Sequence, residues 1–146
     1  MAVSEVKGKE VLLPQTPFLL FNAFTDLRNF ATNLPAEFQG KIEVTYDTLV
    51  AEMQGIRMGI RVEDRLPYSE IRFKEEGQSP FPFKVSFHFE PVGLNQTLFH
   101  IELRAELNMM MKMMLGGKLK EVVDKLTDQI EKAASGQMPE NMPQYS

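Results

Sequence analysis

The sequence predicts an α+β fold in which an antiparallel sheet with one apolar face is covered by a long C-terminal helix. Every second residue is apolar from Phe83 to Phe89 and from Phe99 to Leu107, and polar or charged residues lie between them. Successive side chains of a strand point to opposite faces, so both stretches indicate strands with one buried and one solvated face. After Asn108 the apolar period changes from two residues to three or four, which is typical of a helix.

The first part of the chain predicts one strand followed by two short helices. Residues 3–13 alternate imperfectly and have strand character, and Pro14 ends this strand. Pro17 is well placed as the first residue of a helix. The apolar run from Phe18 to Phe24 indicates that this helix is mostly buried. Residues Thr25 and Asp26 then predict the cap of a second short helix with apolar positions at Leu27, Phe30 and Leu34.

The middle of the chain predicts four further strands. Residues 41–53 indicate a strand pair around the turn at residues 46–48, and Gln54 and Gly55 form the next turn. Two half-buried strands follow, because apolar and polar residues alternate around Met58, Ile60 and Val62 and then around Ile71 and Phe73. A loop over residues 75–82 leads to the strand at Phe83, and residues 91–95 are expected to connect the last two strands as a hairpin.

The C-terminal helix is predicted to be amphipathic. Its apolar stripe consists of Met111, Leu115, Leu119, Val122, Leu126, Ile130 and Ala133. On the opposite face, two pairs place an acid four residues before a base, Glu121 with Lys125 and Asp128 with Lys132. We therefore expect one domain over residues 1–134, and a flexible tail over residues 135–146 where glycine and proline stop the helix.

This order of elements, together with residues 24–30, residues 79–83 and the closing amphipathic helix, resembles the START-like helix-grip superfamily. The superfamily includes the birch pollen allergen, lipid-transfer START domains, polyketide cyclases and coenzyme Q-binding proteins. The resemblance covers Val3 to Ala134 and is closest to small bacterial members with no assigned activity. It implies a strongly curved sheet of about six or seven strands wrapped around the C-terminal helix. It also implies a cavity that often holds a sterol, lipid, quinone or polyketide.

Composition excludes several classes of function. The chain has no cysteine, so disulfides and thiolate chemistry are excluded. Its net charge of −4 is spread over both signs without a basic stripe, which argues against nucleic acid as a partner. No run approaches the roughly 20 apolar residues of a membrane span, and the first ten residues have no secretory signal. We therefore expect a cytoplasmic location and no integral membrane span.

Candidate chemistry is sparse in this sequence. Five methionines between Met109 and Met114 suit adaptable apolar packing or a partner contact better than a copper site. Gly116 and Gly117 cost helix stability, so we expect a kink, a close backbone approach or a hinge there. Both histidines, His88 and His100, fall on the polar face of their strands. Three polar residues are left as candidates for the cavity or its rim: Asn22, Tyr46 and Arg57.

The function that the sequence favours is binding, or transport, of an apolar small molecule such as a lipid, quinone or polycyclic compound between sheet and helix. The expected ligand-binding residues are Met58, Ile60, Ile71, Phe73, Phe87, Phe89, Ile101, Leu103, Met111, Leu115 and Leu119. An alternative is an interaction or homodimerisation module whose core is filled by phenylalanine and methionine. A cyclase-type or hydrolase-type enzyme is a third. We assign no catalytic residue, because no motif of the cyclases is matched, and we assign no metal ligand and no cofactor.

Overall fold

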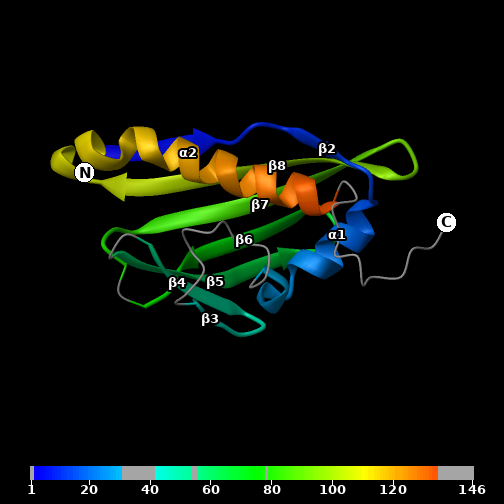
Figure 1. Ribbon diagram of the computed structural model, residues 1–146, viewed down its shortest axis with the longest axis horizontal. Helices are drawn as coiled ribbons and strands as arrows, with labels where there is room; N and C mark the ends of the chain where they lie inside the picture. Colours follow the sequence, from blue (N-terminus) through cyan, green and yellow to red (C-terminus); the bar gives the residue numbers. More distant parts are fainter. Residues whose placement is uncertain (1, 31–41, 54–55, 78, 135–146) are drawn as a thin grey trace.

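A computed structural model describes residues 2–30, 42–53, 56–77 and 79–134 of the chain (Figure 1). It confirms the α+β class, with an antiparallel sheet followed by one long C-terminal helix. The elements, in order, are β1 (Ala2–Lys7), β2 (Val11–Leu13), α1 (Pro17–Phe24), the 3-10 helix η1 (Leu27–Phe30), β3 (Ile42–Val44), β4 (Thr48–Met53), β5 (Ile56–Leu66), β6 (Glu70–Glu75), β7 (Phe83–Val92), β8 (Gln96–Leu107) and α2 (Met109–Ala134).

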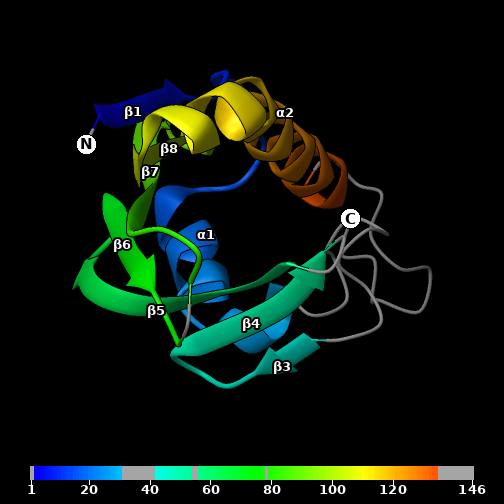
Figure 2. The same ribbon diagram turned by 90° about the vertical axis from the view of Figure 1, so that its left-hand side faces the viewer.

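All eight strands form one antiparallel sheet in the order β1-β8-β7-β6-β5-β4-β3, and β2 also pairs with β8. The sheet curves strongly, so that β3, β4 and β5 turn away from the strands under α2 (Figure 2). Eight strands replace the expected six or seven because the N-terminal strand is divided at Gly8. There the backbone N–H of Gly8 donates to the Ile101 carbonyl at 2.7 Å.

The β7–β8 hairpin forms the centre of the sheet and follows the predicted alternation. Phe87 pairs with Ile101 and Phe89 with Phe99, and all four side chains are buried. The connection is shorter than expected because Pro91 and Val92 still pair with β8, which leaves residues 93–95 as the turn. Gly93 supplies the positive φ of 63° in this turn.

Helix α2 begins directly after Asn108, whose side-chain oxygen accepts the Met111 N–H at 2.8 Å and caps the helix. The helix packs on β8, β1 and β2. Its buried face consists of Leu119, Val123, Thr127 and Ile130. The expected stripe was therefore wrong by one position in the middle of the helix, where Val122 and Leu126 are only half-buried. The Thr127 hydroxyl tolerates burial because it donates to the Val123 carbonyl at 2.8 Å.

Two ion pairs of α2 were not among the expected ones. Lys120 contacts Asp124 at 2.9 Å, and Asp128 pairs with Lys9 from the segment between β1 and β2. The second pairing depends on tertiary structure, because the β1–β2 connection passes beside the helix. These exposed ion pairs contribute little to stability.

Helix α1 begins at Pro17, as predicted, and Thr16 caps it by accepting the Leu19 N–H at 3.3 Å. The prediction that this helix is mostly buried was wrong. Leu20 and Phe21 are buried, whereas Phe18 is exposed, as is Leu19. The helix lies at the edge of the molecule and turns one face to β7 and η1, which leaves its other face to solvent (Figure 1).

Three further expectations lie outside the described residues: the apolar position at Leu34, the turn at Gln54 and Gly55, and the flexible tail over residues 135–146. Within the described part of the chain, no helix is long and apolar enough to cross a membrane.

Candidate functional site

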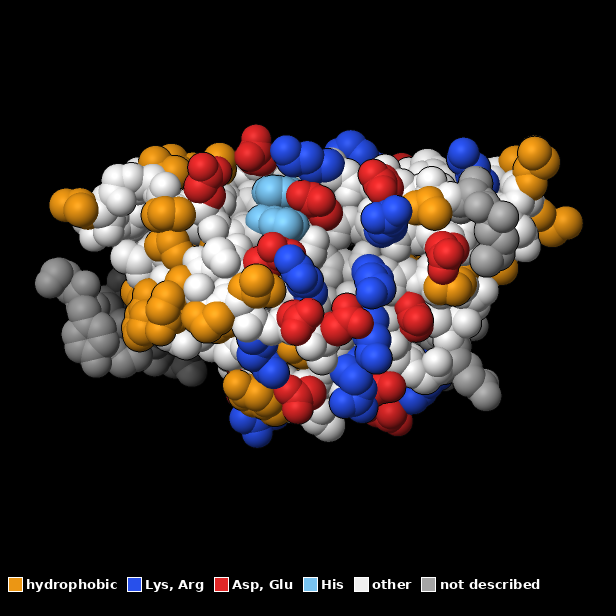
Figure 3. Space-filling model, turned by 180° about the vertical axis from the view of Figure 1, so that it is seen from behind, with side chains coloured by type: hydrophobic (Ala, Val, Ile, Leu, Met, Phe, Trp, Pro, Cys, Tyr) orange, Lys and Arg blue, Asp and Glu red, His pale blue; other side chains and the backbone are white. Residues whose placement is uncertain are grey.

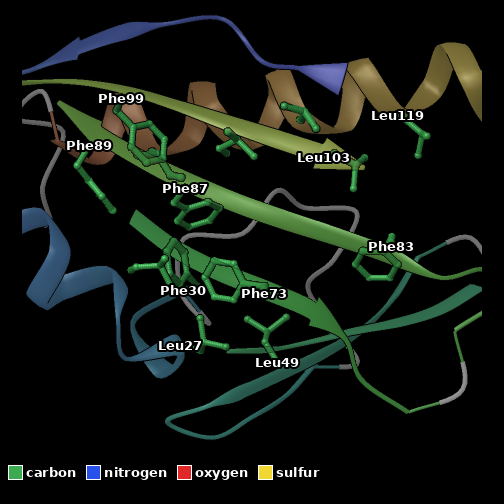
Figure 4. Packing of buried hydrophobic residues seen from close by; sticks show 14 of the residues in the cluster. Leu27, Phe30, Leu49, Phe73, Phe83, Phe87, Phe89, Phe99, Leu103 and Leu119 are labelled. Atoms are coloured by element: carbon green, nitrogen blue, oxygen red, sulfur yellow. The ribbon is translucent and has the colours of Figure 1, made fainter. Parts of the chain in front are cut away.

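The inner face of the sheet, which faces α1, η1 and α2, is filled by phenylalanine rings (Figure 4). Phe87 lies at their centre. Its ring centroid is 4.9 Å from that of Phe73, 5.6 Å from Phe99, 5.8 Å from Phe30 and 6.1 Å from Phe24. All four of these contacts are edge-to-face, an arrangement that aromatic pairs prefer. Protein side chains therefore occupy much of the space expected to hold a ligand.

The eleven expected ligand-binding residues all belong to the core or pack against it. Seven are buried, namely Ile71, Phe73, Phe87, Phe89, Ile101, Leu103 and Leu119. The other four are partly buried, namely Met58, Ile60, Met111 and Leu115. All eleven residues lie on the inner side of the sheet or of α2, as expected from the alternation of apolar and polar residues in the strands and from the apolar stripe of the helix. Whether a ligand contacts them stays a prediction.

An apolar pocket of about 230 Å³ lies where α1, η1 and the last turns of α2 meet. The described residues that line it are Gln15, Leu19, Leu20, Ala23, Phe24, Asn29, Phe30, Ile130, Ala133 and Ala134. None of the eleven expected residues is among them. The helix ends that form this pocket come together only in the tertiary structure (Figure 1).

Two rings separate this pocket from the predicted site. Phe24 and Phe30 line the pocket, and their centroids lie 5.2 Å apart. Both rings also contact the ring of Phe87, which does not line the pocket. The pocket and the predicted residues are therefore neighbouring layers of one apolar interior.

Gln15 gives the pocket wall a polar group with spare hydrogen-bonding capacity. Its Nε2 donates to the Ala134 carbonyl at 2.6 Å, and its backbone carbonyl accepts from Thr97 Oγ1 at 2.7 Å. Its Oε1 is buried and has no partner among the residues that the structure describes. A buried acceptor without a donor costs about 1–3 kcal/mol, so a donor at this position would be favourable. Sequence reasoning missed Gln15, because a single glutamine between Pro14 and a helix carries no distinctive pattern.

The three polar residues proposed for the cavity or its rim take different positions. Asn22 is exposed on α1, and Arg57 pairs with Glu43 at 2.8 Å among exposed side chains. Tyr46 is exposed, and its ring centroid lies 4.6 Å from the Arg65 guanidinium carbon. None of these three lines the apolar pocket.

Arg65, which sequence reasoning also missed, joins three parts of the fold. Its guanidinium donates to Thr25 Oγ1, to the Thr25 carbonyl at 3.0 Å and to Asp47 Oδ1 at 2.8 Å. A β-bulge at Glu63 in β5 gives Arg65 this position. The extra residue reverses the alternation of inward and outward side chains along the strand, so that Arg65 pairs with the buried Ile71. The bulge left no signal in the alternating pattern. Arg65 has the contacts of a residue that fixes α1 against the sheet.

Both histidines lie on the outer, charged face of the sheet (Figure 3). His88 and His100 face each other across β7 and β8, and their rings stack at 4.5 Å with an interplanar angle of 5°. Burial lowers the pKa of His88 below its ordinary value. A hydrogen bond from His100 lowers the pKa of the Glu102 carboxyl. The prediction that the histidines fall on the polar face is correct.

Comparison with known proteins places this arrangement among solved structures. No protein-family model matches the sequence, and no curated protein matches it. The structure superimposes on norcoclaurine synthase from Thalictrum flavum with a TM-score of 0.73 and 8% identity, covering 98% of this chain and 90% of that one. A START superfamily protein from Mycobacterium smegmatis gives a TM-score of 0.66 at 16% identity, covering 92% and 99%. The chain has the START-like helix-grip fold.

A third match, a protein from Thermus thermophilus, has a TM-score of 0.68 at 19% identity over 92% of this chain and 99% of that one. Identities this low establish the START-like fold alone. The structure of norcoclaurine synthase was determined with dopamine and hydroxybenzaldehyde bound. The resemblance drawn from element order and apolar pattern is therefore confirmed at the level of fold.

Proposed function

We propose that this START-like protein binds an apolar small molecule in the pocket between α1, η1 and the end of α2. The observation that supports this is an apolar pocket of about 230 Å³ that opens off a core packed with aromatic rings. Ligand pockets in proteins are concave, mostly apolar, and carry a few placed polar groups. Here those groups are the side chains of Gln15 and Asn29.

The size of the pocket sets the size of the ligand. A cavity of about 150 Å³ is known to hold benzene. The present pocket of about 230 Å³ therefore suits a molecule of one or two rings. A lipid or larger polycycle requires Phe24 and Phe30 to move. Their movement would connect the pocket to Phe87 and to the other ligand-binding residues expected from the sequence.

The ligand is expected to carry a hydroxyl or amine as well as its apolar body. Gln15 Oε1 needs a donor, and reorientation of this amide toward the pocket would let it accept a hydrogen bond from the ligand. Transfer of a ring out of water contributes about 25 cal/mol per Å² of buried apolar area. The hydrogen bond to Gln15 would then select among ligands of similar area.

The first test uses 2-naphthol and naphthalene as probes. The chain contains no tryptophan, so fluorescence of the naphthyl ring is read without tryptophan background. We expect saturable binding that Ala133→Phe abolishes by filling the pocket. The control Lys132→Phe places the same ring at the exposed neighbouring position and should leave binding intact. Equal binding to both variants would contradict the proposed site.

A second comparison tests the role of Gln15. In the wild-type protein 2-naphthol should bind more tightly than naphthalene, and Gln15→Leu should remove most of this preference. The ratio of the two affinities is the informative quantity, because Gln15 also donates to Ala134 and its loss affects both ligands. Native mass spectrometry of protein purified from its own host, followed by extraction, would then identify the natural ligand.

The alternative function, self-association, is supported by a separate observation. The first turns of α2 expose Met109, Met110, Met113 and Met114, whose exposed fractions range from 64% to 85%. Methionine is adaptable and is favoured at binding surfaces. Analytical ultracentrifugation would test this alternative. A dimer that dissociates in Met110→Lys would support it, whereas a monomer at all concentrations would contradict it.

A further inference from the structure

We propose that the outer face of the sheet carries a binding site for a divalent transition metal, formed by His88, His100 and Glu102. The three residues come from β7 and β8, on the side of the sheet opposite the apolar pocket. Figure 3 shows the two histidines and neighbouring acidic groups together on this face. The site is independent of the proposed ligand pocket.

The backbone brings these ligands together. His88 and His100 are directly opposite in the β7–β8 register, and Glu102 is two residues further along β8 on the same face. Side chains of directly opposed residues project side by side with their Cβ atoms about 5 Å apart. One ligand atom of each residue lies within 4.8 Å of the corresponding atoms of the other two.

The distances suit a tetrahedral ion after small side-chain movements. Zinc binds histidine nitrogen and carboxylate oxygen at about 2.0–2.2 Å, so two ligands on one ion lie about 3.4 Å apart. The distance from His88 Nε2 to Glu102 Oε2 is already 3.4 Å. The distance from His100 Nε2 to the same oxygen is 2.6 Å, a direct hydrogen bond that an ion would replace. All three side chains retain access to solvent, with exposed fractions of 26% for His88, 15% for His100 and 47% for Glu102.

Neighbouring side chains supply partners for the ligands. Glu70 from β6 lies opposite His88, and its Oε1 is 3.9 Å from His88 Nδ1, the ring nitrogen that faces away from Glu102. A carboxylate beside the second nitrogen of a metal-bound histidine orients the ring and increases its basicity. Arg72 holds Glu70 in place at 2.6 Å. Ser86 Oγ hydrogen-bonds His88 Nε2 at 2.7 Å, a second contact that an ion on this nitrogen would replace.

The chemistry of the ligands selects the metal. Two imidazole nitrogens and one carboxylate suit zinc, nickel or copper, whereas magnesium and calcium prefer oxygen ligands alone. Three protein ligands leave one tetrahedral position open. A groove of about 570 Å³ on the same face is lined by Glu102 and by the neighbouring Glu70 and Ser86.

The test uses zinc chloride and the untagged chain, because His88 and His100 are its only histidines and it has no cysteine. Isothermal titration calorimetry should find one zinc per chain. We expect Glu102→Gln to weaken binding at least tenfold, and His88→Gln with His100→Gln to abolish it. The matched control is Glu106→Gln, which alters an outward-facing carboxylate four residues further along β8 and should change affinity less than twofold. Magnesium chloride should give no binding.

Nuclear magnetic resonance of the histidine side chains keeps the proposal testable if a variant fails to fold. Zinc should shift the ring-nitrogen signals of both histidines in the wild-type protein at one equivalent, with circular dichroism unchanged. The proposal is overturned if those signals do not respond. It is also overturned if the double histidine variant binds zinc as well as the wild type does, or if Glu106→Gln weakens binding as much as Glu102→Gln.

Discussion

Replacing Gly116 and Gly117 with alanine should stabilise the protein. Both residues lie inside α2. Among the residues that the structure describes, a Cβ added at Gly117 would meet nothing within 4 Å, and at Gly116 the nearest atom would be Lys112 Cγ at 3.8 Å. Of the alternatives expected from the sequence, a close backbone approach is therefore not found, because no neighbour in the described part of the chain is tight enough to require glycine here.

The expected gain follows from helix propensity. Glycine is about 0.8–1 kcal/mol less favourable than alanine in a helix interior, so the two substitutions together contribute about 2 kcal/mol. For a chain near this length, each kcal/mol raises Tm by about 2–4 °C, which gives a rise of roughly 4–8 °C. Urea unfolding and thermal unfolding followed by circular dichroism would measure both quantities.

The result also decides between a structural and a hinge role for the two glycines. A gain in stability with unchanged exchange of a bound naphthol would exclude the hinge hypothesis. A gain in stability with exchange slowed several-fold would support it. Unchanged or reduced stability would refute the reasoning from helix propensity, because it would mean that the helix depends on the two glycines for a bend or contact.

Two further outcomes test the packing at Gly8 and the half-buried Arg65. Gly8→Ala should destabilise the fold by about 1–3 kcal/mol in urea unfolding. The reason is that the added Cβ would lie 2.6 Å from Val123 Cγ1 and 3.0 Å from the Ile101 carbonyl oxygen. An unchanged midpoint of urea unfolding would show that α2 can shift to make room. Arg65→Met should lower the free energy of unfolding by about 1–3 kcal/mol, because it leaves the Thr25 carbonyl without its donor. The control Arg57→Met removes an exposed ion pair with Glu43 and should change the free energy of unfolding by less than about 0.5 kcal/mol. Equal effects of the two arginine substitutions would argue against a special role for Arg65.

Much of the fold could be predicted because local patterns report directly on which face of an element is buried. The alternation in residues 83–89 and 99–107 identified β7 and β8, and Pro17 and Asn108 identified the starts of the two α-helices. The division between β1 and β2 could not be predicted in this way. It depends on the approach of α2 to Gly8, a contact between segments more than 100 residues apart in the sequence.

The candidate sites were less predictable than the fold. The sequence indicated which side chains face the interior, but not that Phe24 and Phe30 would fill the space in front of Phe87. It placed both histidines on the polar face, but not opposite each other, because pairing depends on the register between two strands. The pocket beside Gln15 depends on where the end of α2 lies relative to α1.

By itself, therefore, the sequence determined the polarity of each face, the order of the elements and the START-like fold, since side-chain periodicity and backbone geometry act over a few residues. The tertiary structure decided register, the bulge that turns Arg65 inward, and how much of the interior remains open. These features arise from contacts between distant segments and from the close packing of whole side chains, and no local pattern of residues encodes either.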